Sequence, residues 1–361
     1  MIRFARFALA LLVVCGCSRT GGDEYLSSLK LAEEPISPVD TVDISGCDLL
    51  QPTGIVKFGD WLALTDNQGG RLLYLLNLSD GTSIRVISRG RGPGEMLSVN
   101  ASSSGDRLIL YDPTASRTLV SLDVGESLLH DRAIFDTIAV FKSSNVFPIN
   151  LNSYGGGIVA SLAGRKNVWY ASVGLDGEVK SRIPEPGYDV LRNMDENLYY
   201  SFLSSSHFTL SPDGKRACCT MSCAAAMSFA EIGDGGILRE YRRYEYNPPE
   251  IVRRGELSAF SKDRKVCFST PASDEDAVYV LYSGKSLVGE GESPSYERSH
   301  LIVYDWDGNP LRHCRLSESA MSICVGGGKA YCLSTWPETR VLVYSIGNVK
   351  SDPNQEHCLA H

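Results

Sequence analysis

The groups in this chain best suited to chemistry are arginines and acids beside glycine-rich or polar loops. Arg89-Gly-Arg91-Gly-Pro-Gly-Glu95 places two guanidinium groups among three glycines. Glycine reaches backbone conformations barred to other residues, so several N–H groups could converge there on an anion. The same composition suits any tight turn, in which the arginines pair with Glu95 or with carbonyl groups. The segment lacks the GK[ST] ending of a phosphate-binding loop and the strand-and-helix setting of a dinucleotide site.

Two further groups of charged residues are candidates for ligand contacts. Arg71, Arg117 and Arg340 each close a polar loop immediately before an apolar run. Three equivalent arginines could ring one mouth and favour an anionic or acidic-glycan ligand, and pairing with a neighbouring carboxylate explains them equally well. The other candidate is the mixed-charge loop from Ser283 to His300, which carries Lys285, Tyr296, Arg298 and His300.

Signals for an enzyme are weaker. The paired acids Glu275 and Asp276 sit in a turn, and neighbouring strand residues face opposite ways, so no shared proton is implied. The six histidines are scattered, and none accompanies a nucleophile turn of the GxSxG type. We therefore assign no catalytic residue, no cofactor and no metal ligand from the sequence.

The elements that must position these groups repeat six times. Each repeat is a Gly- or Asp-rich turn, an apolar run, a polar loop and a second apolar run. The turns stand at residues 59–60, 105–106, 156–157, 213–214, 275–276 and 327–328. Their mean spacing of about 54 residues is near that of a propeller blade. The pattern predicts an all-β, six-bladed β-propeller of four-stranded antiparallel blades, closed by an N-terminal strand within Val39 to Ile44, rather than a pair of β-sandwiches.

The connections between the expected strands are unequal. Those after the first and third strand of each blade read as short turns, such as Asp80-Gly81 and Asp307-Gly308. Longer insertions follow the second and fourth strands, at about 184–205, 247–263 and 283–300. In an antiparallel blade these two sets emerge at opposite ends, so we expect a short-turn face and a loop-rich face. Insertions on one face of a repeat fold often carry the binding site, which places our candidate residues on the loop-rich face.

The N-terminus indicates export. Arg3 and Arg6 precede an apolar run from Phe7 to Val14, too short to span a bilayer and typical of a secretory signal. The ending Val14-Cys-Gly-Cys17 resembles a bacterial lipobox, which implies that Cys17 becomes a lipidated N-terminus after cleavage. An ordinary signal peptide with incidental cysteines is the alternative.

Composition is that of a folded, exported chain. Its content of 43% hydrophobic and 22% charged residues is ordinary for a globular protein, and its net charge of −8 disfavours nucleic acid as a partner. Cysteines beyond the signal are irregularly spaced and make no metal-binding set. We expect most of them to be small core residues, with Cys218 and Cys219 on opposite faces of one strand. The sequence leaves undecided whether two of Cys314, Cys324 and Cys332 form a disulfide.

Several phrases carry a family resemblance. Phe208-Thr-Leu-Ser-Pro-Asp-Gly-Lys215 resembles the strand-turn phrase of TolB-type propeller repeats. Gly90 to Glu95, Leu281 to Lys285 and Val303 to Pro310 are similar to phrases of TolB-like six-bladed propeller lipoproteins of Gram-negative anaerobes. The resemblance runs from about residue 52 to 346. It implies a fold and an exported location, and it implies no activity.

These observations combine into one interpretation. We expect a lipoprotein signal at 1–16, a lipidated Cys17 and tether at 17–38, a propeller at 39–350 and a tail at 351–361. The function expected is a monomeric binding module for a protein, peptide or glycan, anchored by lipid in a membrane, with the outer membrane favoured, and without catalytic activity. The alternative is a hydrolase or lactonase whose Ca²⁺ is held by carboxylates in the axial channel, since such ligands would be dispersed in sequence.

Overall fold

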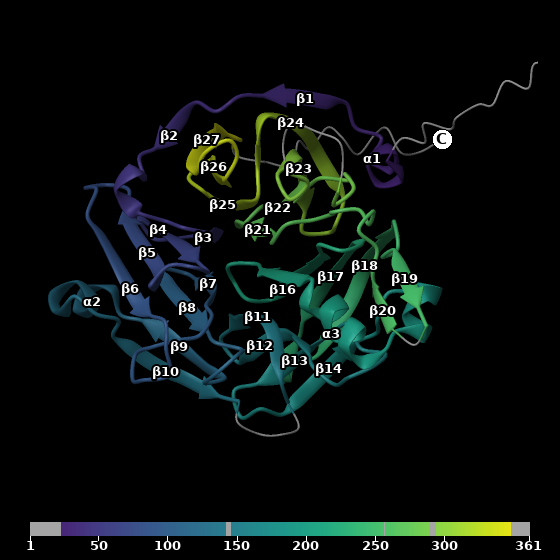
Figure 1. Ribbon diagram of the computed structural model, residues 1–361, viewed down its shortest axis with the longest axis horizontal. Helices are drawn as coiled ribbons and strands as arrows, with labels where there is room; N and C mark the ends of the chain where they lie inside the picture. The colour runs from purple at the N-terminus through teal and green to yellow at the C-terminus, as the bar shows by residue number, and fades with distance from the viewer. Residues whose placement is uncertain (1–22, 142–145, 256, 289–293, 348–361) are drawn as a thin grey trace, which may run out of the picture.

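The computed structural model describes residues 23–141, 146–255, 257–288 and 294–347. Its blades stand around a central axis, seen end on in Figure 1. Within each blade the chain runs antiparallel from the axis outward, and the innermost strands of neighbouring blades contact one another all the way round. The predicted six-bladed propeller is therefore confirmed.

The first three blades follow this order without exception. Blade one is β3 (Pro52–Phe58), β4 (Trp61–Asp66), β5 (Arg71–Asn77) and β6 (Ser83–Ser88). Blade two is β7 (Asn100–Ser104), β8 (Arg107–Tyr111), β9 (Thr118–Leu122) and β10 (Phe135–Val140). Blade three is β11 (Pro148–Tyr154), β12 (Gly157–Leu162), β13 (Tyr170–Gly174) and β14 (Val179–Ile183).

The last three blades include the two strands from the N-terminal segment. Blade four is β15 (Ser206–Leu210), β16 (Arg216–Met221), β17 (Ala225–Ile232) and β18 (Leu238–Tyr246). Blade five is β21 (Ala272–Ser273), β22 (Ala277–Tyr282), β23 (Arg298–Asp305) and β24 (Pro310–Ala320), with β1 (Glu33–Ile36) added in parallel. Blade six is β25 (Ser322–Gly326), β26 (Lys329–Ser334), β27 (Arg340–Ser345) and β2 (Asp40–Val42).

The ring closes as the sequence predicted. Strand β2 pairs antiparallel with β27, and the Val39 N–H donates to the Val343 carbonyl at 2.7 Å. The last blade therefore takes its outer strand from the start of the chain, which removes an open edge. Figure 1 shows β1 and β2 running over the outside of the last two blades.

The expected tether at 17–38 is shorter than the sequence suggested. Residues 23–36 hold α1 (Glu24–Ser28) and β1, and both lie against the propeller. The Tyr25 ring is fully buried, and its hydroxyl bonds to that of Tyr304 at 2.7 Å. Burial of this aromatic ring is what turns the expected linker into part of the fold. The signal segment, Cys17 and the tail at 351–361 lie outside the described residues.

Each blade is covered on both faces by its neighbours, so its middle strands are continuous apolar runs. Strands β12 and β22 are buried throughout. Cys218 and Cys219 pack into two different core clusters, which confirms that they face opposite ways. All eight cysteines from Cys47 to Cys332 are buried and free, so none of the described ones forms the disulfide left open above.

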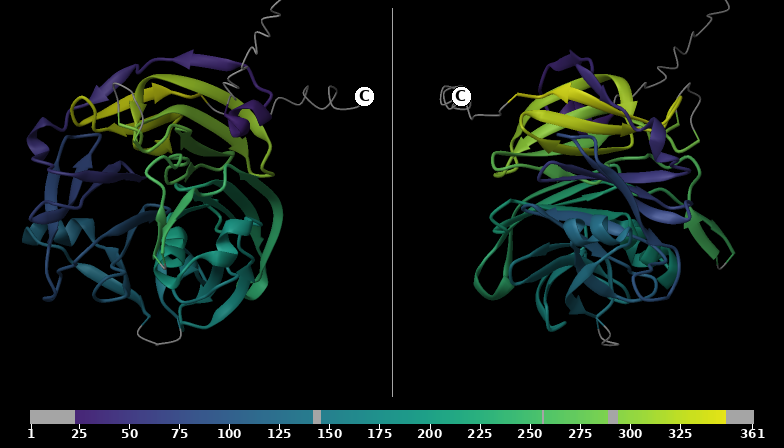
Figure 2. Two further views of the ribbon diagram at one scale, coloured as in Figure 1. Left: turned by 45° about the vertical axis from the view of Figure 1, so that its right-hand side comes forward. Right: turned by 90° about the vertical axis from the view of Figure 1, so that its left-hand side faces the viewer.

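Most insertions lie on the loop-rich face, and they are structured. Between blades three and four stand η2 (Asp189–Asn193) and α3 (Glu196–Ser204), and after β18 comes the hairpin β19 (Ile251–Arg254) and β20 (Leu257–Phe260). The turn η1 (Ser45–Cys47) precedes blade one on this face, whereas η3 (Asp234–Gly236) joins β17 to β18 on the short-turn face. In Figure 2 the β19–β20 hairpin projects from the body of the propeller.

One connection departs from the expected short-turn face. The chain between β9 and β10 is not a tight turn but carries α2 (Val124–His130), which is capped by the Asp123 carboxylate on the Glu126 N–H. Asp123 takes the N-cap position, a signal for a helix start that the turn-based alignment passed over. Figure 1 places α2 at the outer rim, away from the axis. None of the helices in the described ranges is long and apolar enough to cross a bilayer.

Candidate functional site

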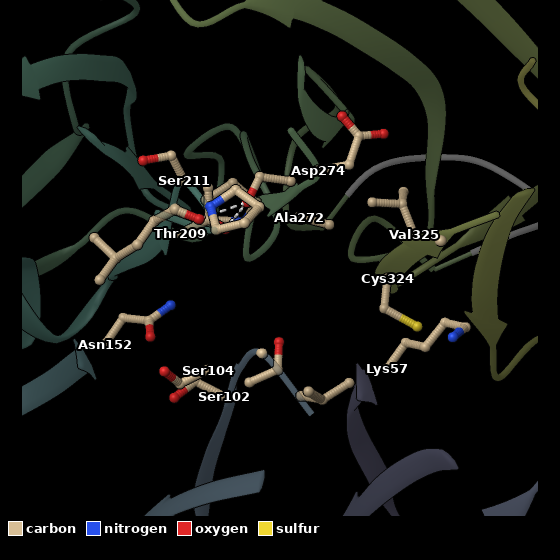
Figure 3. Close-up of a pocket in the computed structure, with 18 of the residues that line it drawn as sticks. Lys57, Ser102, Ser104, Asn152, Thr209, Ser211, Ala272, Asp274, Cys324 and Val325 are labelled. Carbon is tan, nitrogen blue, oxygen red and sulfur yellow. Dashed lines mark hydrogen bonds between the residues drawn. The ribbon is translucent and has the colours of Figure 1, made fainter. Parts of the chain in front are cut away.

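A pocket of about 650 Å³ lies on the axis, on the side of the short turns. All six innermost strands contribute to its wall, together with the turns that follow five of them. Figure 3 shows it with ten residues labelled: Lys57, Ser102, Ser104, Asn152, Thr209, Ser211, Ala272, Asp274, Cys324 and Val325. The same repeat that builds the scaffold thus brings one strand end from every blade to a single cavity.

Hydroxyl and amide groups dominate the polar part of this wall. Asn152 of β11 and Thr209 of β15 point toward the open centre, and Ser102 and Ser104 lie beside them on β7 (Figure 3). The Thr209 hydroxyl shares a hydrogen bond of 2.7 Å with the Ser273 hydroxyl. Neutral groups that both donate and accept suit a ligand rich in hydroxyl or amide groups.

Carboxylates line the rim of the pocket, and they outnumber its basic groups. One lysine, Lys57, stands among the wall residues with five acids: Asp106, Asp213, Asp274, Glu275 and Asp276. The Asp274 carboxylate accepts from the backbone N–H groups of Asp276 and Ala277 at 3.0 and 2.9 Å. In Figure 3 it points away from the cavity, so this acid serves its turn rather than the channel. The excess of negative charge disfavours an anionic ligand.

Asp213 is held in the same manner. It accepts from the Ser211 hydroxyl at 2.6 Å and from the Lys215 N–H at 3.0 Å. The hydroxyl bond, followed by the backbone bond, lowers the pKa of the Asp213 carboxyl. Among the residues that the structure describes, no three carboxylates gather in the channel as a metal site, which the hydrolase alternative requires.

The glycine-rich loop of the loop-rich face is a turn held by its own side chains. Arg89 donates to the carbonyl groups of Leu97, at 3.0 Å, and of Asn67. The Glu95 carboxylate accepts from the Gly92 N–H at 2.8 Å. Arg91 is exposed. The sequence left two interpretations of this loop open, and these contacts favour the structural one.

Each of the three equivalent arginines contacts a different group of the protein. Arg71 donates to the Arg85 carbonyl, the Arg117 guanidinium lies 3.6 Å from the centre of the Phe147 ring, and Arg340 pairs with Glu318 at 2.6 Å. Arg71 and Arg340 begin the third strands of their blades, Arg117 directly precedes one, and none of the three lines the axial pocket. These contacts favour the structural interpretation of the three arginines, and a ring around the mouth of the loop-rich face stays a prediction.

The loop expected at 283–300 ends earlier than predicted, because β23 begins at Arg298. Lys285 and Tyr296 are exposed, whereas the Arg298 side chain is buried. It donates to four carbonyl groups: those of Cys267 (2.9 Å), Phe268 (2.8 Å), Tyr296 (2.8 Å) and Met321 (3.1 Å). Burial lowers the pKa of Arg298 to about 10, which leaves it charged at neutral pH. This residue joins blades, and it is not available to a ligand.

His300 is also buried in β23 rather than exposed in a loop. Its Nδ1 lies 2.9 Å from Nε2 of His313 on β24 and 3.3 Å from a carboxylate oxygen of Glu33 on β1. The sequence analysis assigned no role to His313 or Glu33. Counting outward from the Asp307-Gly308 turn pairs Ile302 with His313, which would have placed the two histidines diagonally across one hairpin.

The pocket residues were missed for a different reason. The apolar runs that reveal the repeat follow each turn, whereas the pocket is lined by the strands that precede it. Ser102, Ser104 and Asn152 each lie within four residues before a turn that the repeat had already located. The innermost strand of each unit was therefore the informative one for the site.

Solved structures similar to this chain share low sequence identity with it. A member of the DUF4221 family from Bacteroides vulgatus is 12% identical, with a TM-score of 0.49 over 87% of this chain and 96% of that one. A protein of unknown function from Bacteroides caccae is 10% identical, with a TM-score of 0.43 over 76% and 85%. The calcium-binding protein regucalcin from Agrobacterium tumefaciens is 12% identical, with a TM-score of 0.47 over 88% and 98%.

The comparison with curated proteins found no match. A family model does match, and it spans most of the propeller. The model described as TolB-like 6-blade propeller-like covers residues 49–327, from just before blade one to the turn after β25. The chain therefore belongs to the TolB-like six-bladed propeller family.

Proposed function

We propose that the protein is an exported binding module whose axial pocket takes a polar oligosaccharide without negative charge. The observation that carries this proposal is the wall of the pocket, where hydroxyl and amide groups from blades two to five line about 650 Å³ of space. Sugars present alternating donors and acceptors that such neutral groups can satisfy.

The charge of the rim decides between classes of sugar. The acids around the pocket outnumber its one lysine even without Asp274, and this net negative charge repels a carboxylated or sulfated glycan and attracts an amine-bearing one. The arginines of the loop-rich face suggested an anionic ligand instead, but Arg89, Arg117 and Arg340 contact carbonyl, aromatic and carboxylate groups of the protein itself. A neutral or amino oligosaccharide is therefore the ligand class we favour over a peptide or an acidic glycan.

A glycan array with neutral, amine-bearing and carboxylated oligosaccharides tests the proposal. We expect binding to the first two classes and none to the third. Ser104→Trp, which fills the pocket from β7, is expected to weaken binding at least about tenfold, or 1.4 kcal/mol. Ser201→Trp, at an exposed position on α3 of the loop-rich face, is the matched control. Binding to no oligosaccharide, or equal binding by the two tryptophan variants, would contradict the proposal.

The location of the module rests on the sequence alone. We propose that Cys17 carries a lipid anchor and that the propeller faces the periplasm or the cell surface from the outer membrane. Radioactive palmitate should label the wild type and leave Cys17→Ala unlabelled. Equal labelling of the two proteins would show that Cys17 is not the site of lipid attachment, and it would leave the proposal for the axial pocket unaffected.

A further inference from the structure

Glu33, His300 and His313, here called the blade-five triad, come from three adjacent strands of one sheet. Glu33 on β1 pairs directly with His313 on β24, and β24 pairs with β23, which carries His300. Both histidines are buried, and Glu33 is half-exposed at the outer edge. The triad is the one group of three or more potential metal ligands in the described part of the chain.

The spacing of the three ligand atoms matches a metal site. His300 Nδ1 and His313 Nε2 are 2.9 Å apart, and a Glu33 oxygen lies 3.3 Å from the first and 3.6 Å from the second. Zn²⁺ binds nitrogen and carboxylate oxygen at about 2.0–2.2 Å in a tetrahedron, whose corners are then about 3.3–3.6 Å apart. The three atoms thus occupy roughly one face of such a tetrahedron, and the half-exposed side of Glu33 leaves the fourth corner toward solvent.

The protonation of the histidines also suits a metal. Burial lowers the pKa of His300 to about 4, helped by Arg315 and His313, and burial lowers that of His313 as well. Neutral imidazole is the form that binds Zn²⁺. A hydrogen bond between the two rings explains why His300 Nδ1 and His313 Nε2 lie close together. It does not explain why the Glu33 oxygen lies close to both.

Arg315 is the group that opposes the metal. Its guanidinium donates to His300 Nε2 at 2.6 Å, so in the neutral ring the proton of His300 sits on Nδ1. Binding of a metal at Nδ1 requires this proton to move to Nε2. A protonated Nε2 can no longer accept the hydrogen bond from Arg315, so the Arg315 guanidinium opposes the move. Arg315 is exposed, so its side chain can turn into solvent when the metal enters. Asp23 and Lys285 also act on His300, with opposite signs, and Asp23 is itself paired with Lys265 at 3.2 Å.

We propose that the blade-five triad binds Zn²⁺ with a fourth, solvent-held position, and that the ion joins the N-terminal strand β1 to blade five. This site is separate from the axial pocket, since β1 and β24 lie at the outer edge of the sheet and β21 at its inner edge. Its role is to hold the segment of chain between the expected lipid anchor and the propeller.

Zn²⁺ titration by isothermal calorimetry, and the visible spectrum of bound Co²⁺, test the proposal. His357, Cys358 and His361 of the tail could bind metal independently, so all proteins compared carry substitutions at these three positions. We expect one Zn²⁺ per chain and a four-coordinate Co²⁺ spectrum in the protein with an otherwise wild-type sequence. Glu33→Gln and His313→Gln should weaken Zn²⁺ at least about tenfold, by analogy with the cost of lesser disturbances around bound metals.

Two variants make the test specific. Glu34→Gln is the matched control, because Glu34 lies next in β1 but pairs with Arg312 on the other side of the strand. It should leave the affinity for Zn²⁺ unchanged. Arg315→Gln should strengthen binding about tenfold by releasing His300 Nε2, a gain that a purely structural role of the triad does not produce. Absence of Zn²⁺ binding in the wild type, or equal affinity in the Glu33 and Glu34 variants, would overturn the proposal.

The position of β1 allows Zn²⁺ binding to be measured by protection from a protease. Zn²⁺ should slow cleavage by trypsin after the exposed Lys30, which precedes β1. The protection should disappear in Glu33→Gln, whose half-exposed side chain makes the variant well suited to folding normally. Protection that persists in this variant would place the metal elsewhere.

Discussion

The two faces of the propeller use polar side chains in opposite ways. On the loop-rich face the charged groups are consumed by the fold: the buried Asp66 carboxylate accepts from four backbone N–H groups, and Arg298 donates to four carbonyl groups. On the short-turn face, the carboxylates of Asp213 and Asp274 are likewise held by their turns, but uncharged hydroxyl and amide groups of blades two to five line open space. A charged motif in a loop is thus weak evidence for a ligand, because buried backbone groups compete for the same charge.

The largest effect expected from this comparison is at Arg298. Arg298→Met keeps much of the length of the side chain but leaves four carbonyl groups without their donor, which should cost about 3–5 kcal/mol of unfolding free energy. Urea denaturation measures it. The comparison would break if the variant kept its stability and lost oligosaccharide binding instead, since Arg298 would then belong to a site.

A smaller, pH-dependent effect is expected at Glu297, which accepts from the Thr335 N–H and hydroxyl at 2.6 and 2.7 Å. Burial raises the pKa of Glu297 above its ordinary value of 4.5, although these hydrogen bonds oppose the rise. An acid whose pKa is raised by folding binds its proton more tightly in the folded state, so its contribution to stability falls as pH rises through the window above 4.5.

Glu297→Gln removes this titration. The unfolding free energy of the wild type minus that of the variant should therefore fall between pH 4.5 and the raised pKa, and become constant above it. Denaturant titrations across this range measure the difference. A difference that grows with pH would mean that the hydrogen bonds outweigh the burial of the carboxylate.

The smallest effect separates two arginines of one loop. Arg89→Ala removes donors to two carbonyl groups on an exposed surface and should cost about 0.5–1.5 kcal/mol. Arg91→Ala, at an exposed position of the same loop, should change stability by less than about 0.5 kcal/mol. Neither variant should alter oligosaccharide binding. Loss of binding in Arg91→Ala alone would return the ligand to the loop-rich face.

The fold was predictable because the signal that specifies it is local and repeated. Each turn, such as Asp213-Gly214 or Gly327-Gly328, marks a hairpin by its own backbone requirements, and six of them at even spacing determine the architecture. The closing strand at Asp40–Val42 followed from the need to cover an open edge. The helix α2 was missed because its Asp123 cap lies where the other blades have a turn.

The site was much less predictable. The pocket is made by strand ends from six blades, and no spacing along the chain reports which of their side chains share a cavity. Arg298 and His300 read as loop residues because 283–297 lacks apolar periodicity, yet β23 begins at Arg298. Glu33 joins His313 only because β1 packs in parallel on the outermost strand of blade five, a pairing between positions 280 residues apart.

Amide hydrogen exchange with and without the tightest-binding oligosaccharide tests the central claim most directly, because it reports which face the ligand covers. The account predicts slower exchange in the innermost strands and their turns, at 101–106, 152–157 and 208–214, with residues 89–95 and 184–205 unchanged. Protection of 89–95 and 184–205, with the axial segments unchanged, would contradict it and assign binding to the loop-rich face.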